Sequence, residues 1–278
     1  MIHTMNIRGQ LINFQKPCVM GILNITPDSF YSGSRKQTEA EVVDRTNQIL
    51  AEGGKIIDIG AFSTRPGAFE VTEEEEIKRL KWALAIVRRE QPNAVVSVDT
   101  YRPAVARLCV EEWGADIIND VSEGGLTGIV NTAIHEKESM FETVAKLQVP
   151  YILMSVQANM HKMLKAFASE IQQLNALGAK DIILDPGFGF GKTLEENYQD
   201  MQKLEQLQIF DLPVLVGISR KSMIYKLLGG YPTTSLNGTT ALNMIALQKG
   251  TSILRVHDVK ECVEVCRIYE QLSANQAE

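Results

Sequence analysis

Long apolar runs are missing from this sequence. No segment approaches the roughly 18–20 apolar residues of a membrane-spanning helix, and the polar start Met1–Thr4 lacks the apolar core of a signal peptide. We therefore expect a cytoplasmic protein that does not enter a membrane. Cysteine is also sparse. The four cysteines show no C-x-x-C spacing and lie in apolar contexts, which favours buried thiols over a metal site, even for Cys262 and Cys266 on one helix face.

A basic region is missing as well. The 278 residues carry a formal net charge of -6, with charges of both signs spread along the chain. Because nucleic-acid binders carry a basic patch or stripe, this pattern argues against nucleic acid as the main partner and leaves room only for local anion binding. Repeats, low-complexity segments and linkers are absent, and the length with 45% hydrophobic content suits one α/β barrel. We expect a single domain over residues 1–278.

Short apolar runs do recur, with helical patterns between them. The runs are rich in isoleucine and valine and are continuous rather than alternating, as in parallel strands that are covered on both sides. Eight such strands alternating with helices are typical of a (β/α)8 barrel, the TIM barrel, and an open doubly wound sheet is the alternative. The runs are Val19–Leu23, Lys55–Ile59, Ala94–Val98, Asp116–Ile118, Tyr151–Met154, Asp181–Leu184, Pro213–Val216 and Ser252–Val256.

Capping residues predict where several helices begin and end. Thr38 and Glu41 have the spacing of a capping box, and the helix that they open ends at the glycines after Glu52. Thr72 precedes a run of glutamates, which suits the amino-terminal end of another helix. Further helices are expected over Arg102–Gly114, His161–Gly178, Ser222–Leu228 and Leu236–Lys249.

The segment Asp185–Thr193 is a glycine-rich turn between a strand and a helix. Its glycines let the backbone approach a ligand, and the following helix start offers free N–H groups to an anion. Pro186 restricts Asp185 to an extended conformation, which aims its carboxylate. The ending Gly-Lys-Thr resembles a nucleotide P-loop, but Pro186 stands where that motif requires a glycine, five residues before Gly191. A glycine-rich connection that binds no ligand is the other alternative.

Polar residues stand at or just after the ends of most predicted strands. In a parallel barrel these ends form one rim, where functional side chains collect. Each residue alone could be a helix cap. Together, their carboxylates and amides suit a flat heterocycle with several N–H groups, and their cationic side chains suit phosphate or a developing anion. The segments 26–34 and 62–68 are candidate lids. The rim residues are Asn24, Asp58, Asp99, Asn119, Asp185, Lys221, Arg255 and His257.

Seven segments between about residue 17 and about residue 265 carry recognisable motifs. They are Met20–Phe30, Ser63–Ala68, Ser97–Thr100, Ile118–Asp120, Asp185–Thr193, Gly217–Ser222 and Arg255–Val259. In content and order they resemble the dihydropteroate synthase family, the folate-pathway enzymes that sulfonamides inhibit. The resemblance implies a (β/α)8 barrel, usually a homodimer, that condenses 6-hydroxymethyl-7,8-dihydropterin diphosphate with 4-aminobenzoate. The products would be 7,8-dihydropteroate and pyrophosphate, and Mg2+ would be the cofactor.

The resemblance also implies roles for individual residues. The pterin would be held by Asp99, Asn119, Asp185 and Lys221, and the diphosphate by Asn24, Arg255 and His257. Asn24, with Asp28 near it, would lie at the Mg2+ ion. The aminobenzoate side, where sulfonamides compete, would be formed by Thr64, Arg65, Pro66, Phe190, Lys221 and Ser222, and Gly217 would also contact substrate. Catalysis would depend on Asp99, Asp185, Lys221 and Arg255.

Two positions depart from the family pattern. Phe62 stands where the family commonly has glutamate, and Ser155 stands where a histidine is expected, followed by an unusual segment at 156–160. Both departures lie near the expected site and put its hydrogen bonds in doubt. Three alternatives therefore stay open: a pterin-binding paralogue without catalysis, a pterin-dependent methyltransferase that acts on a corrinoid protein, and a barrel whose rim residues are only helix caps.

Overall fold

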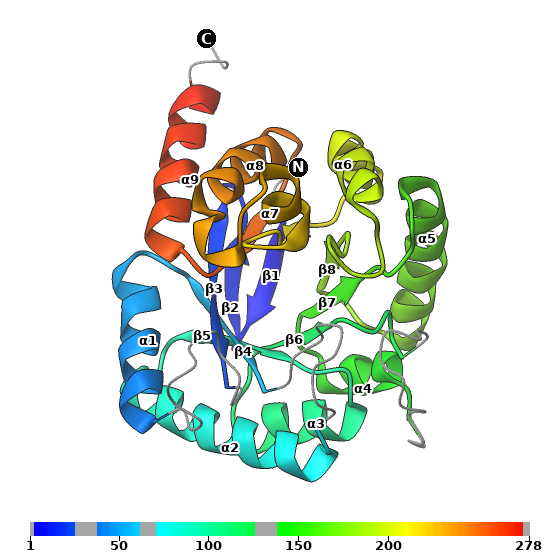
Figure 1. The fold of residues 1–278 in the computed structure, drawn as a ribbon. Coiled ribbons are helices and arrows are strands. Elements are labelled where there is room, and N and C mark those ends of the chain that lie inside the picture. Colours follow the sequence, from blue (N-terminus) through cyan, green and yellow to red (C-terminus); the bar gives the residue numbers. More distant parts are fainter. Residues whose placement is uncertain (1–2, 26–37, 62–70, 126–137, 275–278) are drawn as a thin grey trace.

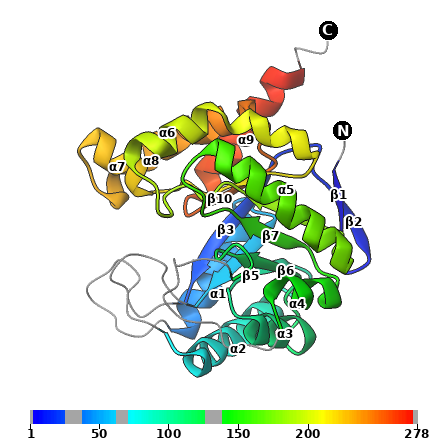
Figure 2. The same cartoon turned by 90° about the vertical axis from the view of Figure 1, so that its right-hand side faces the viewer.

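The computed structural model describes residues 3–25, 38–61, 71–125 and 138–274 of the chain. In this part of the chain, parallel strands form a ring at the centre and helices surround it (Figures 1 and 2). A short antiparallel hairpin of β1 (Thr4–Ile7) and β2 (Gln10–Asn13) lies against one end of the ring.

All eight predicted strands are present and parallel, paired in the order β8-β7-β6-β5-β4-β3-β10-β9. A parallel bridge between Leu184 and Val214 joins the two ends of this order, and the Leu184 amide donates to the Pro213 carbonyl over 2.9 Å. The sheet is therefore a barrel, and the alternative of an open sheet is wrong. The strands are β3 (Cys18–Asn24), β4 (Ile56–Gly60), β5 (Val95–Asp99), β6 (Ile117–Asp120), β7 (Tyr151–Met154), β8 (Ile182–Asp185), β9 (Leu215–Val216) and β10 (Ile253–Val256).

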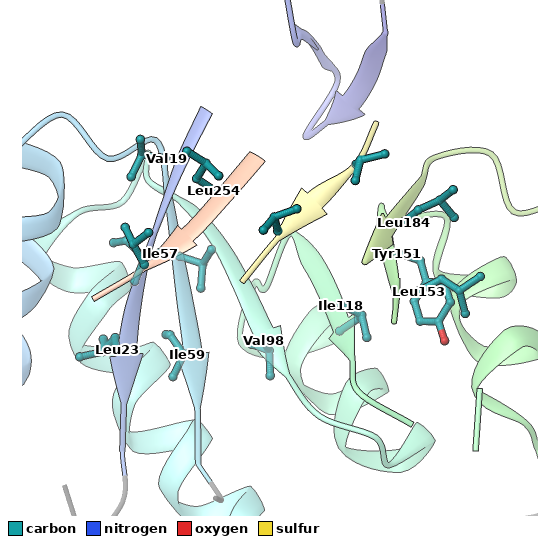
Figure 3. Packing of buried hydrophobic residues seen from close by; sticks show 14 of the residues in the cluster. Val19, Leu23, Ile57, Ile59, Val98, Ile118, Tyr151, Leu153, Leu184 and Leu254 are labelled. Atoms are coloured by element: carbon teal, nitrogen blue, oxygen red, sulfur yellow. The ribbon is translucent and has the colours of Figure 1, made fainter. Parts of the chain in front are cut away.

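Both faces of the ring are covered by apolar side chains. Successive residues of a strand point to opposite faces. One set, including Leu23, Ile57 and Val98, packs between the strands and the helices (Figure 3). The other set fills the barrel interior near the strand starts and is called the barrel floor. Burial on both faces explains why the strands read as continuous apolar runs. The floor residues are Cys18, Met20, Ile56, Ile117, Ile152, Ile183, Leu215 and Ile253, with Met5 and Ile7 of the hairpin.

The hairpin closes the amino-terminal end of the barrel. Met5 and Ile7 are only 2% and 5% exposed because they pack on the floor. At the turn, Arg8 and Gly9 have φ angles of 51° and 77°, the left-handed conformation that tight hairpin turns favour. The Arg8 guanidinium binds the carboxylate of Asp116, just before β6. The sequence prediction lacks this hairpin, because strands of four residues give too short an alternation to identify.

The predicted helices are present with the expected caps. The Thr38 hydroxyl accepts from the Glu41 amide over 3.3 Å, and the Glu41 carboxylate accepts from the Thr38 amide over 2.7 Å. Helix α4 was not predicted, although Ser139 caps it in the same way. The helices are α1 (Glu39–Ala51), α2 (Glu73–Glu90), α3 (Pro103–Glu111), α4 (Met140–Leu147), α5 (Met160–Leu177), α6 (Leu194–Gln202), α7 (Ser222–Leu228), α8 (Leu236–Gln248) and α9 (Val259–Ala274), with 3-10 helices at Leu204–Phe210 and Pro232–Thr234.

Two sequence expectations concern membrane-spanning helices and the state of the cysteines. None of the described helices is long and apolar enough to cross a membrane. The four cysteines are buried and free, as predicted. Among the residues that the structure describes, no three or more histidine, cysteine, aspartate or glutamate side chains are grouped so as to hold a metal ion.

Candidate functional site

A layer of polar side chains lies directly above the barrel floor. On several strands a polar residue stands two positions after a floor residue, so both point into the interior. At about 3.3 Å per residue, the polar member lies roughly 7 Å closer to the carboxyl end of the barrel. We call this set the polar layer, and it includes Asp99, which ends β5. Its members are Asp58 after Ile56, Asn119 after Ile117, Asp185 after Ile183, Arg255 after Ile253, and Asp99.

Arg255 joins two carboxylates of the polar layer. Its Nε donates to Asp58 Oδ2 over 2.7 Å, and its Nη2 donates to Asp99 Oδ2 over 3.2 Å. Asn119 Nδ2 also donates to Asp58 Oδ2, over 3.2 Å. Side chains from β10, β4, β5 and β6 are thus connected inside the barrel. The Asp58 side chain is fully buried and that of Arg255 is 18% exposed, so little water screens their attraction.

Two acceptor atoms of this network lack a donor among the described residues. Asp99 Oδ1 and Asn119 Oδ1 are both buried and without a hydrogen-bond partner. A buried acceptor left unpaired costs on the order of 1–3 kcal/mol, so a ligand that supplies N–H groups would bind favourably here. Asp99 and Asn119 are register partners on neighbouring strands. One planar ligand with more than one N–H group can therefore satisfy both atoms.

Two carboxyl groups of the layer, those of Asp99 and Asp185, have perturbed pKa values. Burial raises the pKa of Asp99 to about 7; Arg255 opposes this rise and Asp58 adds to it. Burial also raises the pKa of Asp185, against the influence of Lys221 and of the hydrogen bond from the Gly187 amide. Titratable groups with shifted pKa values that gather in one interior are typical of a functional site.

The glycine-rich turn brings Asp185 next to Lys221. Asp185 Oδ1 accepts from the Gly187 amide over 2.8 Å. Lys221 Nζ donates to the Phe188 carbonyl over 2.6 Å and lies 4.5 Å from the centre of the Phe190 ring, a cation–π contact. Burial lowers the pKa of Lys221 from 10.5 to about 8, and Asp185 is the main opposing influence. Ammonium, ring and carboxylate thus share one side of the barrel mouth.

His257 follows β10 directly and stands two residues after Arg255. Its Nδ1 and the Ser219 hydroxyl are 3.1 Å apart, and its carbonyl accepts from Arg45 over 2.6 Å. Burial lowers the pKa of His257 to about 3, and Arg255 adds to the effect. His257 was expected among the cations of the rim, but its imidazole is neutral near pH 7 and can offer a hydrogen bond, not a charge. No sequence pattern pointed to Arg45, because its contact with the His257 carbonyl spans 212 positions.

The remaining predicted site residues fall into two groups. Asn24 ends β3, where its Oδ1 and Asp99 Oδ2 both border Gly60. Gly217 follows the floor residue Leu215 by two positions and leaves space beside Arg255. Ser222 begins α7, next to Lys221. Outside the described residues lie Asp28, Phe62, Thr64, Arg65, Pro66 and the candidate lids at 26–34 and 62–68.

Ser155, one of the two departures, does not belong to the polar layer. The inward position after the floor residue Ile152 is Met154, because side chains alternate along β7. The Ser155 hydroxyl instead donates to Glu123 Oε1 over 3.3 Å, and Gln157 Nε2 donates to both oxygens of Glu123 over 3.2 and 3.1 Å. The departure therefore changes a buried network beside the site and removes no member of the polar layer.

Comparison with known proteins assigns the chain to a family. The model of the pterin binding enzyme family matches residues 20–257. The dihydropteroate synthase of Escherichia coli strain K12 is 40% identical over 286 residues, which cover 97% of this chain and 96% of that protein. The chain belongs to the dihydropteroate synthase family.

Solved structures of family members have the same fold. The Yersinia pestis dihydropteroate synthase in complex with a sulfonamide drug has a TM-score of 0.87 and 36% identity, covering 98% of this chain and 100% of that one. The Xanthomonas albilineans dihydropteroate synthase with 4-aminobenzoic acid has a TM-score of 0.85 and 32% identity, covering 98% of both chains. The resemblance found in the sequence is confirmed. The alternative of a corrinoid-linked methyltransferase finds no support among these relatives.

Proposed function

We propose that the protein condenses 6-hydroxymethyl-7,8-dihydropterin diphosphate with 4-aminobenzoate to give 7,8-dihydropteroate and pyrophosphate. The unpaired acceptors Asp99 Oδ1 and Asn119 Oδ1 carry this proposal. A pterin ring is planar and offers several N–H groups, so it can satisfy both atoms and the Asp185 carboxylate at once. Membership of the dihydropteroate synthase family supports the same reaction.

The polar layer can stabilise the charge that this reaction develops. When the bond between the methylene carbon and the diphosphate oxygen breaks, positive charge remains on the methylene beside the ring. The carboxylates of Asp99 and Asp185 are already fixed in a poorly screened interior, so they stabilise that charge without reorganising. We assign the departing diphosphate to Arg255, whose Nη1 binds no described residue, and to the neutral imidazole of His257.

The second substrate completes the reaction. The amine nitrogen of 4-aminobenzoate bonds to the methylene carbon and loses one proton, which leaves with the pyrophosphate or to water. We assign the carboxylate of 4-aminobenzoate to the Lys221 ammonium and to Ser222 at the start of α7. Its ring would stack on Phe190, which makes a cation–π contact with Lys221. We also propose that Thr64, Arg65 and Pro66 contact 4-aminobenzoate, as the family resemblance implies.

Mg2+ is the cofactor that we propose. This ion usually keeps several waters and binds one or two protein oxygens together with substrate phosphates. Asn24 fits that mode, because it presents an oxygen at the end of β3 near Asp99, and the diphosphate would bring the other ligands. When bound, Mg2+ supplies positive charge that offsets the charge of the departing diphosphate.

A pyrophosphate-release assay tests the function. Purified protein is given Mg2+, the dihydropterin diphosphate and 4-aminobenzoate, and each component is omitted in turn. We expect release that requires all three and a product that is dihydropteroate. Tight binding of the pterin substrate without product would instead identify a paralogue without catalysis, and reversion of Phe62 and Ser155 would be the next step.

The shifted pKa of Lys221 predicts a basic limb in the pH profile. Its ammonium is present below about pH 8 and is lost above it, and kcat/KM reports the ionisation of the free enzyme. We expect kcat/KM for 4-aminobenzoate to fall by about tenfold per pH unit above that value. The variant Lys221→Arg keeps its charge throughout and should lose this limb, at a lower overall rate. The same limb in both proteins would rule out Lys221 as its source.

We further propose a homodimer in the cytoplasm, with a single domain over residues 1–278. Exposed apolar side chains on α7, on α9 and just before the 3-10 helix that follows α7 support a contact between copies. Sedimentation of the purified protein at micromolar concentration measures this state, and a monomer would contradict it. These side chains, between 51% and 73% exposed, are Leu227, Leu228, Tyr231, Ile268 and Leu272.

A further inference from the structure

Lys192 is the lysine of the Gly-Lys-Thr sequence that resembles a P-loop, and neither the residue roles implied by the family resemblance nor the proposed reaction includes it. Its side chain is completely buried. Its Nζ donates to the carbonyls of Pro186 and Gly187 over 2.7 and 3.0 Å. A P-loop lysine reaches outward to phosphate, whereas this one points back into its own turn. Its charge therefore acts on the turn that follows Asp185.

A single peptide group connects Lys192 to Asp185. The Pro186 carbonyl and the Gly187 amide belong to the same planar peptide. Lys192 Nζ binds the oxygen of this group, and the N–H of the same group donates to Asp185 Oδ1 over 2.8 Å. A cation on the oxygen polarises the peptide, which strengthens its N–H as a donor. The ammonium thereby stabilises both the position and the negative charge of the carboxylate.

With the Lys192 contact in place, the turn has little freedom to rearrange. Gly187 has a φ of +66°, and a Cβ there would lie 2.0 Å from the Ser155 carbonyl oxygen. The end of β7 thus blocks one side of the turn, and the Lys192 ammonium holds the other. Without the ammonium, the Pro186 carbonyl has no donor among the described residues, and the peptide that holds Asp185 is free to rotate toward one.

Among the described residues, no carboxylate forms a hydrogen bond with the Lys192 ammonium. The nearest carboxylate oxygen, Asp200 Oδ2, lies 3.9 Å away, beyond hydrogen-bond distance. Burial lowers the pKa of Lys192, while Asp200, Asp185 and Glu123 raise it. At Asp185, burial favours the neutral acid, and the charges and donors that oppose it are Lys221, the Gly187 amide, Arg255 and Lys192.

We propose that Lys192 is a positioning residue for substrate binding. Through the Pro186–Gly187 peptide, Lys192 fixes the Asp185 carboxylate and keeps it ionised. The proposal rests on the proposed function in one respect, namely that Asp185 binds the pterin. Lys192 itself does not touch substrate. Its effect should therefore be seen in the affinity for the pterin and in the pH dependence of that affinity.

Two variants separate the charge from the hydrogen bonds. Lys192→Gln removes the charge but keeps a donor, and Lys192→Met removes both. The probe is 6-hydroxymethylpterin, and calorimetry measures its dissociation constant between pH 5 and pH 8.5. We expect binding at pH 8 to weaken by about tenfold in Lys192→Gln, the factor that corresponds to one pKa unit, and further in Lys192→Met. The loss of binding on acidification should begin at a higher pH in Lys192→Gln, because less positive charge then opposes protonation of Asp185.

A matched control distinguishes positioning from general stability. Arg88 is another largely buried cation that donates to backbone carbonyls, those of Ala94 and Gly114, but it lies at the amino-terminal end of the barrel. Arg88→Met should lower the melting temperature and leave pterin affinity within about twofold, since it lies far from the polar layer. An equal loss of affinity in Arg88→Met would overturn the proposal.

The remaining outcomes are also decisive. Wild-type affinity with a wild-type pH dependence in Lys192→Gln would show that Lys192 does not act on Asp185. If Lys192→Met does not fold, Lys192→Gln decides alone. If the wild-type protein itself does not bind the pterin, the proposed function fails, and this result is distinct from a failure of the role of Lys192.

Discussion

Replacement of Asp185 by asparagine is expected to lower kcat/KM by about 10²–10³-fold while the barrel stays folded. The amide keeps one acceptor for the Gly187 N–H but has no negative charge to stabilise the cation beside the pterin ring. Because burial raises the pKa of Asp185, the ionised carboxylate opposes folding above that pKa. Asp185→Asn removes this cost, so its melting temperature at pH 8 should equal or exceed that of the wild type.

The control for this variant is Asp116→Asn at the other end of the barrel. The Asp116 carboxylate binds Arg8 and Arg88 and accepts from the Val96 amide over 2.8 Å. Its replacement should lower stability and leave kcat/KM near the wild-type value. The two variants should therefore show opposite patterns of activity and stability. Near wild-type turnover by Asp185→Asn would remove Asp185 from the mechanism.

Loss of Arg255 should damage activity and stability together. Arg255→Met leaves the carboxylates of Asp58 and Asp99 in the interior without the cation that joins them. Breaking one side of a buried ion pair typically costs about 3–5 kcal/mol, which urea unfolding can measure. We expect kcat/KM to fall by at least about 10²-fold, because the diphosphate also loses a donor. Without Arg255, the pKa of Asp99 should rise further above about 7.

A double variant separates the two effects of Arg255. In Arg255→Met with Asp58→Asn, one of the two uncompensated carboxylates becomes an amide. Stability should return in part, since a neutral side chain costs less to bury than an unpaired charge. Activity should stay low, because the guanidinium that we assign to the leaving group is still missing. A single variant as stable as the wild type, or a double variant that regains activity, would contradict this account.

Local sequence pattern was enough to predict the barrel and the positions of its polar layer. Continuous apolar strands with a polar residue at the carboxyl end place Asp58, Asn119 and Asp185 without any knowledge of contacts. Capping boxes such as Thr38 with Glu41 similarly fix helix starts, because both partners lie within one turn. These features depend on neighbours that are close in the chain.

The interactions that the sequence could not predict join distant residues. Arg255 meets Asp58 across 197 positions, and Arg45 meets the carbonyl of His257 across 212. Neither contact has a local pattern. The neutral state of His257 follows from burial and from neighbouring arginines, which only the fold brings together. Lys192 had a visible motif, but its direction depends on three left-handed glycines of the turn.

The two-residue spacing between the barrel floor and the polar layer bears on how such a protein can evolve. Strands β4, β6, β8 and β10 each carry a floor residue and, two positions later, a residue of the polar layer. A new substrate could be accommodated by substitutions at the second position while the first, and the hairpin sealed beneath it, continued to hold the barrel together. An insertion of one residue within a strand would exchange inward for outward side chains and lose both at once. Within the strands, a change of substrate therefore depends on substitution at existing positions, whereas the loops at the carboxyl ends can also change in length.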